Sequence, residues 1–329
     1  MTCPPFLRPL TALLFLAACG GSSAPQVLAQ NESAPVALAA AADGSALFWI
    51  DDSDSPTGAT VRRLALSGAA QPTTIATGFG APKALAVDGA TVYWLSGDGH
   101  LRSVAAAGGT PAILATEPAG YTPFALVAQG GALYWLSTQA QGVDANGNPT
   151  GNAVLASLSL SSGAQRKELQ QMPAFADANT PTLLATDGSG VFWAQADGNI
   201  GTLDAAGKAS FVARRQGQLS ALAVAGGNAY WIQNINGTAV LIRQRLGALP
   251  APALVASMPL TVALVGDAGF IYAAGPTTAA VSRVSVSDGA LGTLVSDPQG
   301  ANALALGPGA LYVISISAGG EGRILRVAR

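Results

Sequence analysis

The stretch ALAVDGATVYWLSGDGHLRSVAAAGGTPAILAT, residues 84–116, holds four short apolar segments separated by glycine turns. The segments are residues 84–87, 91–95, 100–105 and 111–116, and the turns lie at Asp88-Gly89, Gly97-Asp98-Gly99 and Gly108-Gly109. These turns are tight because glycine tolerates positive φ and aspartate hydrogen-bonds its own backbone. The second segment, TVYWL, lacks polar alternation, which is typical of a strand buried on both faces. The stretch therefore predicts four antiparallel strands.

A pair of bulky apolar residues recurs seven times along the chain, each time in an equivalent second segment. The pairs are Phe48-Trp49, Tyr93-Trp94, Tyr134-Trp135, Phe192-Trp193, Tyr230-Trp231, Ile271-Tyr272 and Leu311-Tyr312. Their second members are 45, 41, 58, 38, 41 and 40 residues apart. A period of about 40 residues with four short strands per unit is the signature of a β-propeller blade. We therefore predict an all-β, seven-bladed β-propeller with four antiparallel strands in each blade.

The two ends of the chain are predicted to share the last blade. The seventh repeat stops at residues 324–329 (ILRVAR), a third strand that no fourth strand follows. Residues 24–29 (APQVLA) resemble a fourth strand such as residues 71–76 (QPTTIA). An N-terminal strand that completes the last blade would close the ring and remove an open sheet edge. The 58-residue step contains an insertion, residues 138–153, which we expect to lengthen the loop between the second and third strands of blade three.

The N-terminus has the features of a targeting segment. Residues 10–18 (LTALLFLAA) follow Arg8 and form an apolar run that is too short to span a bilayer as a helix. The run ends in Leu16-Ala17-Ala18-Cys19-Gly20, which resembles the lipobox of bacterial lipoproteins. The resemblance implies a signal peptide over residues 1–18, a Cys19 acylated with palmitate-type chains, a short linker up to residue 24, and one propeller domain over residues 25–329. The alternative is an ordinary secretory signal that happens to contain a cysteine.

The same resemblance implies an exported protein anchored by lipid to a bacterial membrane. Gly20, not aspartate, follows the cysteine, and by analogy with enteric lipoproteins this favours the periplasmic face of an outer membrane where the host has one. Cys3 falls within the removed segment, so the mature chain would carry one acylated cysteine and no disulfide. We expect a monomer.

Composition and motifs exclude several classes of protein. Only 10% of the 329 residues are charged, the net charge is −2 and no basic stripe is present, which argues against a nucleic-acid partner. His100 is the only histidine, so a Ser-His-Asp triad or a multi-histidine metal site is nearly excluded. No catalytic residue is predicted. A carboxylate- or metal-dependent hydrolase or lyase of the lactonase or glycosidase type, with its site at the central channel, stays open because paired acids need not be neighbours in sequence.

Two acidic segments are candidate calcium loops, since Ca²⁺ takes six to eight oxygen ligands. The candidate ligands are Asp51, Asp52, Asp54 and Asp144. The segment that begins at Asp144 departs from a calcium loop, because Pro149 stands where glycine is required and Leu155 where a bidentate glutamate is required. The alternatives are a solvated turn for the first segment and a mobile loop for the second. No other cofactor is predicted.

The aromatic pairs, with the quartet Phe48-Trp49-Ile50-Asp51, resemble the Tyr-Trp-Thr-Asp repeats of six-bladed propellers in lipoprotein-receptor ectodomains. They also resemble the repeats of many bacterial secreted propellers. The resemblance covers residues 36–329, but only blade one keeps the final aspartate and the repeat count here is seven. It therefore implies an architecture and not a ligand.

Ligands of propellers usually meet the face built from the loops between the second and third strands and the loops between blades. Here the between-blade loops hold residue types enriched in protein interfaces, namely Phe79, Lys83, Tyr121, Phe124, Met172, Phe175, Arg214, Arg215, Gln216, Met258 and Gln299. The predicted binding residues are Phe79, Tyr121, Phe175, Arg214 and Arg215. The predicted function is a binding or assembly module for a protein, a small ligand or a glycan. The alternative is that these side chains tuck under their own loops and fill the channel mouth.

Overall fold

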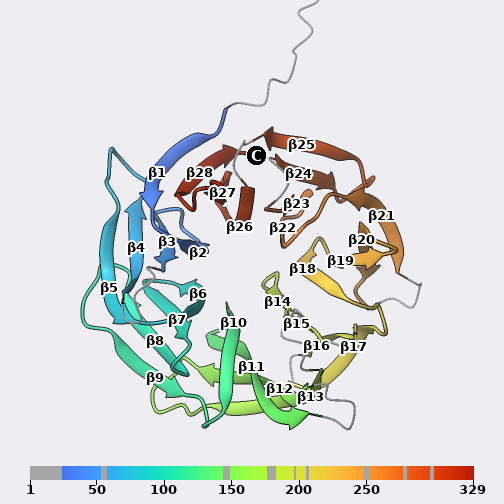
Figure 1. The fold of residues 1–329 in the computed structure, drawn as a ribbon, viewed down its shortest axis with the longest axis horizontal. Helices are drawn as coiled ribbons and strands as arrows, with labels where there is room; N and C mark the ends of the chain where they lie inside the picture. Colours follow the sequence, from blue (N-terminus) through green and yellow to red (C-terminus); the bar gives the residue numbers. More distant parts are fainter. Residues whose placement is uncertain are drawn as a thin grey trace, which may run out of the picture.

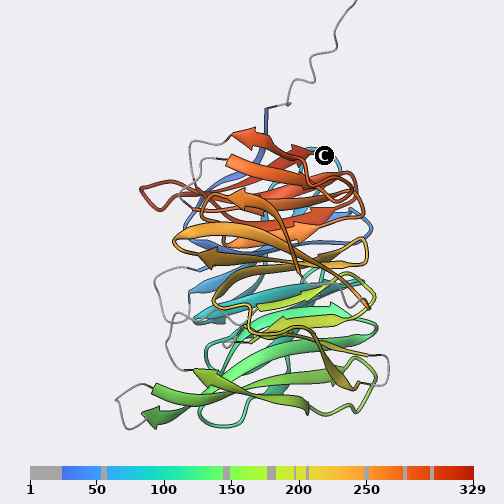
Figure 2. The same ribbon diagram turned by 90° about the vertical axis from the view of Figure 1, so that its right-hand side faces the viewer.

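The molecule is a ring of seven four-stranded antiparallel sheets around a central axis, seen end-on in Figure 1 and from the side in Figure 2. The structure is a computed structural model and describes residues 24–52, 58–143, 149–175, 183–195, 198–204, 207–247, 252–276, 280–296 and 300–329. These residues form 28 strands. The predicted seven-bladed β-propeller is confirmed. Among the described residues, none belongs to a helix long and apolar enough to cross a membrane.

The first four blades follow one another along the chain, from the innermost strand to the outermost. Blade one comprises β2 (Pro35–Ala40), β3 (Ala46–Asp51), β4 (Ala59–Ala65) and β5 (Thr73–Phe79). Blade two comprises β6 (Pro82–Asp88), β7 (Thr91–Ser96), β8 (His100–Ala105) and β9 (Ala112–Thr116). Blade three comprises β10 (Tyr121–Gln129), β11 (Ala132–Val143), β12 (Pro149–Ser159) and β13 (Lys167–Phe175). Blade four comprises β14 (Leu183–Thr186), β15 (Val191–Ala194), β16 (Ile200–Leu203) and β17 (Ala209–Ala213).

The last three blades repeat the pattern, and the seventh takes its outer strand from the other end of the chain. Blade five comprises β18 (Leu219–Ala225), β19 (Asn228–Ile235), β20 (Thr238–Arg245) and β21 (Ala253–Met258). Blade six comprises β22 (Ala263–Gly266), β23 (Phe270–Ala274), β24 (Ala280–Ser285) and β25 (Leu291–Ser296). Blade seven comprises β26 (Gly300–Gly307), β27 (Ala310–Ile316), β28 (Gly322–Ala328) and β1 (Gln26–Glu32).

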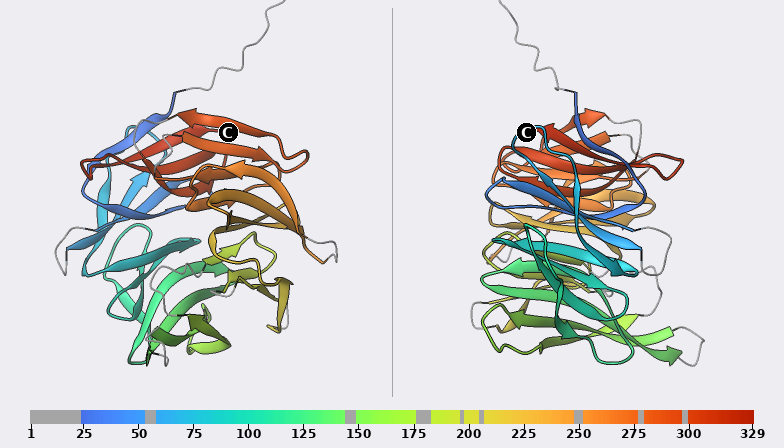
Figure 3. Two further views of the ribbon diagram at one scale, coloured as in Figure 1. Left: turned by 45° about the vertical axis from the view of Figure 1, so that its right-hand side comes forward. Right: turned by 90° about the vertical axis from the view of Figure 1, so that its left-hand side faces the viewer.

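The ring closes as the sequence predicts. Strand β1 pairs antiparallel with β28, from Gln26 opposite Arg326 to Glu32 opposite Gly322, and Figure 3 shows β1, in blue, beside the red C-terminal strands. A segment near the N-terminus thus supplies the missing fourth strand of blade seven. The closure leaves no blade with a missing outer strand, which limits open sheet edges.

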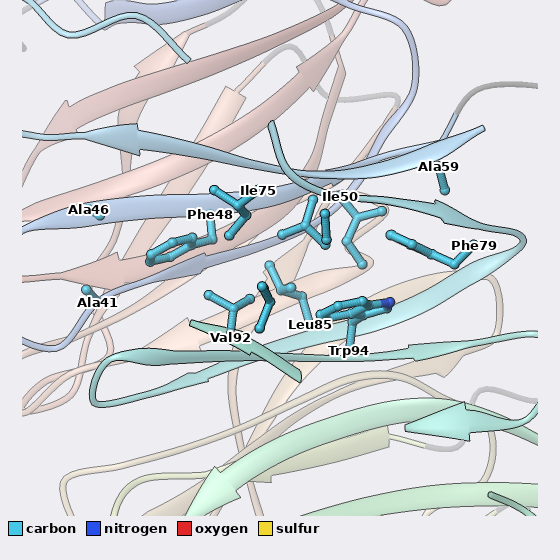
Figure 4. Close-up of a cluster of buried hydrophobic side chains, with 13 residues drawn as sticks. Ala41, Ala46, Phe48, Ile50, Ala59, Ile75, Phe79, Leu85, Val92 and Trp94 are labelled. Carbon is cyan, nitrogen blue, oxygen red and sulfur yellow. The ribbon is translucent and has the colours of Figure 1, made fainter. Parts of the chain in front are cut away.

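The core lies between neighbouring sheets. In blade two, residues 92–96 of β7 are all buried, which confirms that the second strand packs on both faces. Figure 4 shows the layer between blades one and two, in which Phe48 and Ile50 face Val92 and Trp94. All five tryptophans of the chain lie at equivalent positions of second strands, and each is at most 1% exposed. The apolar pair therefore fills the space between blades, and this explains its recurrence.

Every outer strand carries a β-bulge at the same position. The register to the third strand skips one residue, and in all seven blades that residue is aliphatic: Leu28, Ile75, Leu114, Leu169, Val212, Val255 and Leu294. A bulge increases the local twist of a strand. The repeated bulge gives each sheet a similar outer twist.

The insertion in blade three differs from the prediction. Most of residues 138–153 belongs to strands, because β11 and β12 continue to pair from Thr138 opposite Ala153 as far as Val143 opposite Pro149. The insertion thus lengthens the hairpin itself and not only its loop. The extended antiparallel pairing satisfies the backbone hydrogen bonds of these residues, which a long irregular loop would leave unpaired.

Gly201 of β16 tests the packing between strands. A Cβ at this position would lie 2.3 Å from the indole of Trp193, its cross-strand neighbour. We expect Gly201→Ala to lower the free energy of unfolding by about 1–3 kcal/mol, because overpacking forces the ring or the backbone to move. Chemical denaturation measures this change.

The matched control is Gly292→Ala in β25, where a Cβ meets nothing within 4 Å. This substitution should leave stability unchanged or slightly raised. Equal losses for the two variants would contradict the proposed contact.

Candidate functional site

The ring has two faces with different loops. We call the first the connection face; it carries the loops between blades and those between second and third strands, including residues 97–99, 117–120, 214–218 and 259–262. We call the second the turn face; it carries the other hairpin loops, including residues 41–45, 130–131, 160–166 and 187–190. All the predicted binding residues lie at the connection face.

Phe79 does not belong to a contact surface. It is 3% exposed, and its ring centroid lies 5.2 Å from that of Trp94 in the next blade (Figure 4). Its position at the end of an outer strand places it over the second strand that follows. Met172 and Met258 are buried as well. The predicted surface role of Phe79 is therefore wrong, and for all three residues the alternative holds, because their side chains pack into the core between blades.

The remaining predicted residues lie in different environments. Tyr121 begins β10 and is half-buried against the core between blades two and three. Arg214 and Arg215 are exposed after the end of β17. Phe175 is the last residue of β13, and its side chain lies outside the described part of the structure.

The Arg214-Arg215 loop is held tightly on its own blade. The guanidinium carbon of Arg214 lies 3.9 Å from the centroid of the Phe211 ring. The backbone N–H of Arg215 donates to Asn199 Oδ1 at 3.0 Å, and the N–H of Gln216 donates to the Gly198 carbonyl at 2.9 Å. Arg215 adopts a φ of 55°, which is unusual for a residue with a Cβ. The loop therefore presents two cations from an ordered backbone.

Two buried carboxylates lie at blade junctions and were missed by the sequence analysis. The indole Nε1 of Trp49 donates to Glu32 Oε2 at 2.9 Å, and the Nε1 of Trp135 donates to Glu117 Oε1 at 2.6 Å. Glu32 is the last residue of β1 and Glu117 directly follows β9, so each lies near the position where Phe79 covers Trp94. The signal was present in the sequence: two of the four glutamates precede a repeat tryptophan by 17 and 18 residues.

Each of these carboxylates also meets an arginine. Arg166 forms two contacts with Glu117, from Nε at 2.9 Å and from Nη2 at 3.1 Å, whereas Arg62 lies 3.8 Å from Glu32. Burial raises the pKa of Glu32 above its ordinary value, against the opposing effects of Trp49 and Arg62. Glu32 joins blade seven to blade one and Glu117 joins blade two to blade three, so the two acids do not face each other across a common site. Their contacts connect neighbouring blades, which is a structural role.

The first acidic segment has a structural role as well. Asp51 accepts hydrogen bonds from the backbone N–H of Ala34 at 2.8 Å and of Ser33 at 3.3 Å, which fastens the connector between β1 and β2. The backbone N–H of Asp52 donates to the carbonyl of Ala34. Asp54 and Asp144 lie outside the described residues. Within the described ranges, no three His, Cys, Asp or Glu side chains gather to hold a metal ion.

The fold has close structural parallels, while sequence comparison finds none. No protein-family model matches the chain, and no curated protein matches it. An oligogalacturonate lyase from Vibrio parahaemolyticus superimposes with a TM-score of 0.65 at 11% identity, covering 91% of this chain and 90% of that one. The WD40 propeller domain of Doa1 gives 0.63 at 16% identity, covering 92% and 97%. YCF48 from Cyanidioschyzon merolae gives 0.62 at 11%, covering 93% and 99%. These likenesses establish the propeller fold alone, a fold that serves both enzymes and binding modules.

Glu32 should impose a pH dependence on stability. Its folded-state pKa is raised, so the folded protein holds this proton to a higher pH than the unfolded chain, whose glutamates titrate near about 4.3. Stability from this group is therefore present below that pH and is lost as pH rises through the raised value. We expect wild type to lose stability relative to Glu32→Gln as pH increases from about 4. Urea denaturation over a pH series measures the difference.

Glu321→Gln is the control, since this glutamate is exposed on the loop between β27 and β28. Its stability difference from wild type should show no such trend. A pH-independent difference for Glu32→Gln would contradict the role of burial.

Proposed function

We propose that this protein is an exported, lipid-anchored propeller whose connection face docks a protein partner. The observation that carries the proposal is the exposed stack of Arg214 on Phe211 beside Arg215. Arginine and aromatic side chains dominate binding energy at protein interfaces, especially where they are held in place before binding. The hydrogen bonds of residues 215 and 216 to blade four supply that preorganisation.

Exposed apolar side chains extend this region over the neighbouring blades. Ile235 ends β19, and Leu260 and Val262 lie in the connection to β22; all three are exposed, and all belong to the connection face of blades five and six. The connection there is braced, because Ser220 Oγ donates to the carbonyl of Thr261 at 2.9 Å. Exposed apolar residues and two arginines on one face of the ring have the composition of an interface centre. We define the docking sector as Phe211, Arg214, Arg215, Ile235, Leu260 and Val262.

The entry of β1 into the ring bears on how the anchor would orient the molecule. Gln26 pairs with Arg326 close to the C-terminus, so β1 starts at the turn face and reaches the connection face at Glu32. Residues 20–25 can span roughly 20 Å. With Cys19 acylated, the bilayer would meet the turn-face side of blade seven, and the docking sector would point away from it. A partner that approaches from the aqueous side or the cell wall fits this arrangement better than one embedded in the same membrane.

Acylation of Cys19 is tested directly. Cells grown with labelled palmitate should incorporate the label into the wild-type protein and not into Cys19→Ser, which should leave the membrane fraction. Protein blots of membrane and soluble fractions measure both effects. Two results would contradict the lipid anchor: incorporation of label into Cys19→Ser, or a wild-type protein that carries no label and is recovered in the soluble fraction.

The docking sector is tested by cross-linking in the native host, followed by affinity purification and mass spectrometry. We expect one partner near stoichiometry with wild type, and at least a tenfold weaker interaction with the purified partner for Arg214→Glu combined with Tyr121→Ala. The double substitution removes a cation of the docking sector and a second connection-face residue, Tyr121, whose half-buried ring packs against the core between blades two and three.

Arg245→Glu is the matched control, since it reverses an exposed arginine at the turn-face end of β20. It should bind the partner and melt as wild type does. The double variant should melt at a lower temperature because Tyr121 packs against the core, and it should remain folded at the temperature of the binding assay. Unchanged binding by the double variant would overturn the docking sector, and no reproducible partner would overturn the proposed function.

A further inference from the structure

A cleft of about 850 Å³ opens on the turn face between blades three and four. Its walls are the hairpin loops at residues 130–131 and 160–166 of blade three and residues 189–190 of blade four. Blade four contributes the small residues Ser189, Gly190 and Gly207 together with Val191, Leu203 and Asp204. The volume lies within the range of small-molecule sites. It lies on the opposite face of the ring from the docking sector.

The cleft marks a departure from the repeat. Tyr134 is the first member of its apolar pair, and the six equivalent residues are buried: Phe48 1%, Tyr93 7%, Phe192 4%, Tyr230 1%, Ile271 0% and Leu311 0% exposed. Tyr134 alone of the seven is only half-buried, and it lines the cleft. An aromatic ring that fills the core in other blades is here accessible to a ligand.

The wall towards the central channel is locked by hydrogen bonds between the two blades. Gln129 Nε2 donates to the carbonyl of Gly188 at 2.6 Å, and Thr186 Oγ1 donates to Gln129 Oε1 at 2.8 Å. Gly188 N–H donates in turn to Thr186 Oγ1 at 3.2 Å. Because these bonds fix the spacing of the blades, the cleft exists without a conformational change.

The lining combines a small apolar floor with many uncharged polar groups. Val191, Leu169 and Leu203 supply apolar surface. The hydroxyl and amide groups are those of Ser157, Ser159, Ser161, Ser162, Ser189, Tyr134, Gln129 and Gln165. Ser157 is the cross-strand neighbour of Tyr134 and is 9% exposed. Lys167 and Asp204 add one charge of each sign at the rim.

We propose that this cleft binds a short oligosaccharide. A sugar ring presents an apolar C–H face, which suits the ring of Tyr134, and a girdle of hydroxyls that both donate and accept hydrogen bonds, as serine and glutamine side chains do. A site with many neutral polar groups and balanced charge suits a polyhydroxylated ligand better than a strongly ionic one. This site goes beyond the proposed docking of a protein and does not depend on it.

Saturation-transfer NMR tests the proposal with the chain from residue 19 to residue 329. The oligosaccharides offered are chitotetraose, cellotetraose, maltotetraose, xylotetraose and trigalacturonate. We expect transfer to at least one member, with affinity at least tenfold lower for Tyr134→Ala, and for Ser162→Trp, which fills the cleft from an exposed position. Tyr134→Phe should retain most of the affinity, because the ring is kept. Melting curves confirm that the variants fold.

Arg214→Glu with Tyr121→Ala is the control that separates the two proposals, since it alters the connection face and should bind the sugar as wild type does. Transfer to no member of the panel would overturn the proposal, as would transfer that Tyr134→Ala and Ser162→Trp leave unchanged. Loss of sugar binding in the connection-face variant as well would place the sugar elsewhere and would also overturn it.

Discussion

The burial of one bulky side-chain pair per blade between neighbouring sheets is the interaction on which this ring depends. The second strand is covered on both faces, and its large residue, such as Trp49 or Trp231, is fully removed from water. A single four-stranded sheet cannot provide that cover, so every blade needs a neighbour on each side. Ring closure follows from this need. Strand β1 completes blade seven, and Glu32 at its end accepts the indole N–H of Trp49 in blade one.

The packing of each second strand against the next blade also explains why the two buried carboxylates, Glu32 and Glu117, have structural roles. A residue that ends an outer strand lies over the second strand of the next blade. Phe79 fills this position with an aromatic contact, whereas Glu32 and Glu117 fill it with a hydrogen bond to the indole and a nearby arginine. In blades one and three the buried indole N–H finds an acceptor and the buried carboxylate finds a donor, so each satisfies the other. The buried indole N–H groups of Trp94, Trp193 and Trp231 have no hydrogen-bond partner among the described residues. An acid committed in this way is a poor candidate for proton transfer in a channel.

The two faces of the ring carry different chemistry because they are built from different loops. The connection face has a braced loop that holds Arg214 over Phe211, with exposed aliphatic residues on the following blades. The turn face has short glycine and serine turns, and a cleft opens between blades three and four. The first surface suits a protein and the second a hydroxyl-rich small molecule. The two proposals place their ligands on opposite faces of the ring, so the ligands would not compete for one surface.

Repeat spacing, glycine turns and the unmatched third strand at the C-terminus were enough to predict seven blades and the closure by residues 24–29. They suffice because turn chemistry and apolar runs act over a few neighbouring residues and recur with each blade. The environment of single side chains was not predictable in the same way. Phe79 is buried and the indole of Trp135 reaches Glu117 because of contacts with a neighbouring blade, whereas Tyr134 is half-buried where it lines the cleft between blades three and four. Such contacts join residues that one sequence cannot pair, and the packing of adjacent sheets determines them.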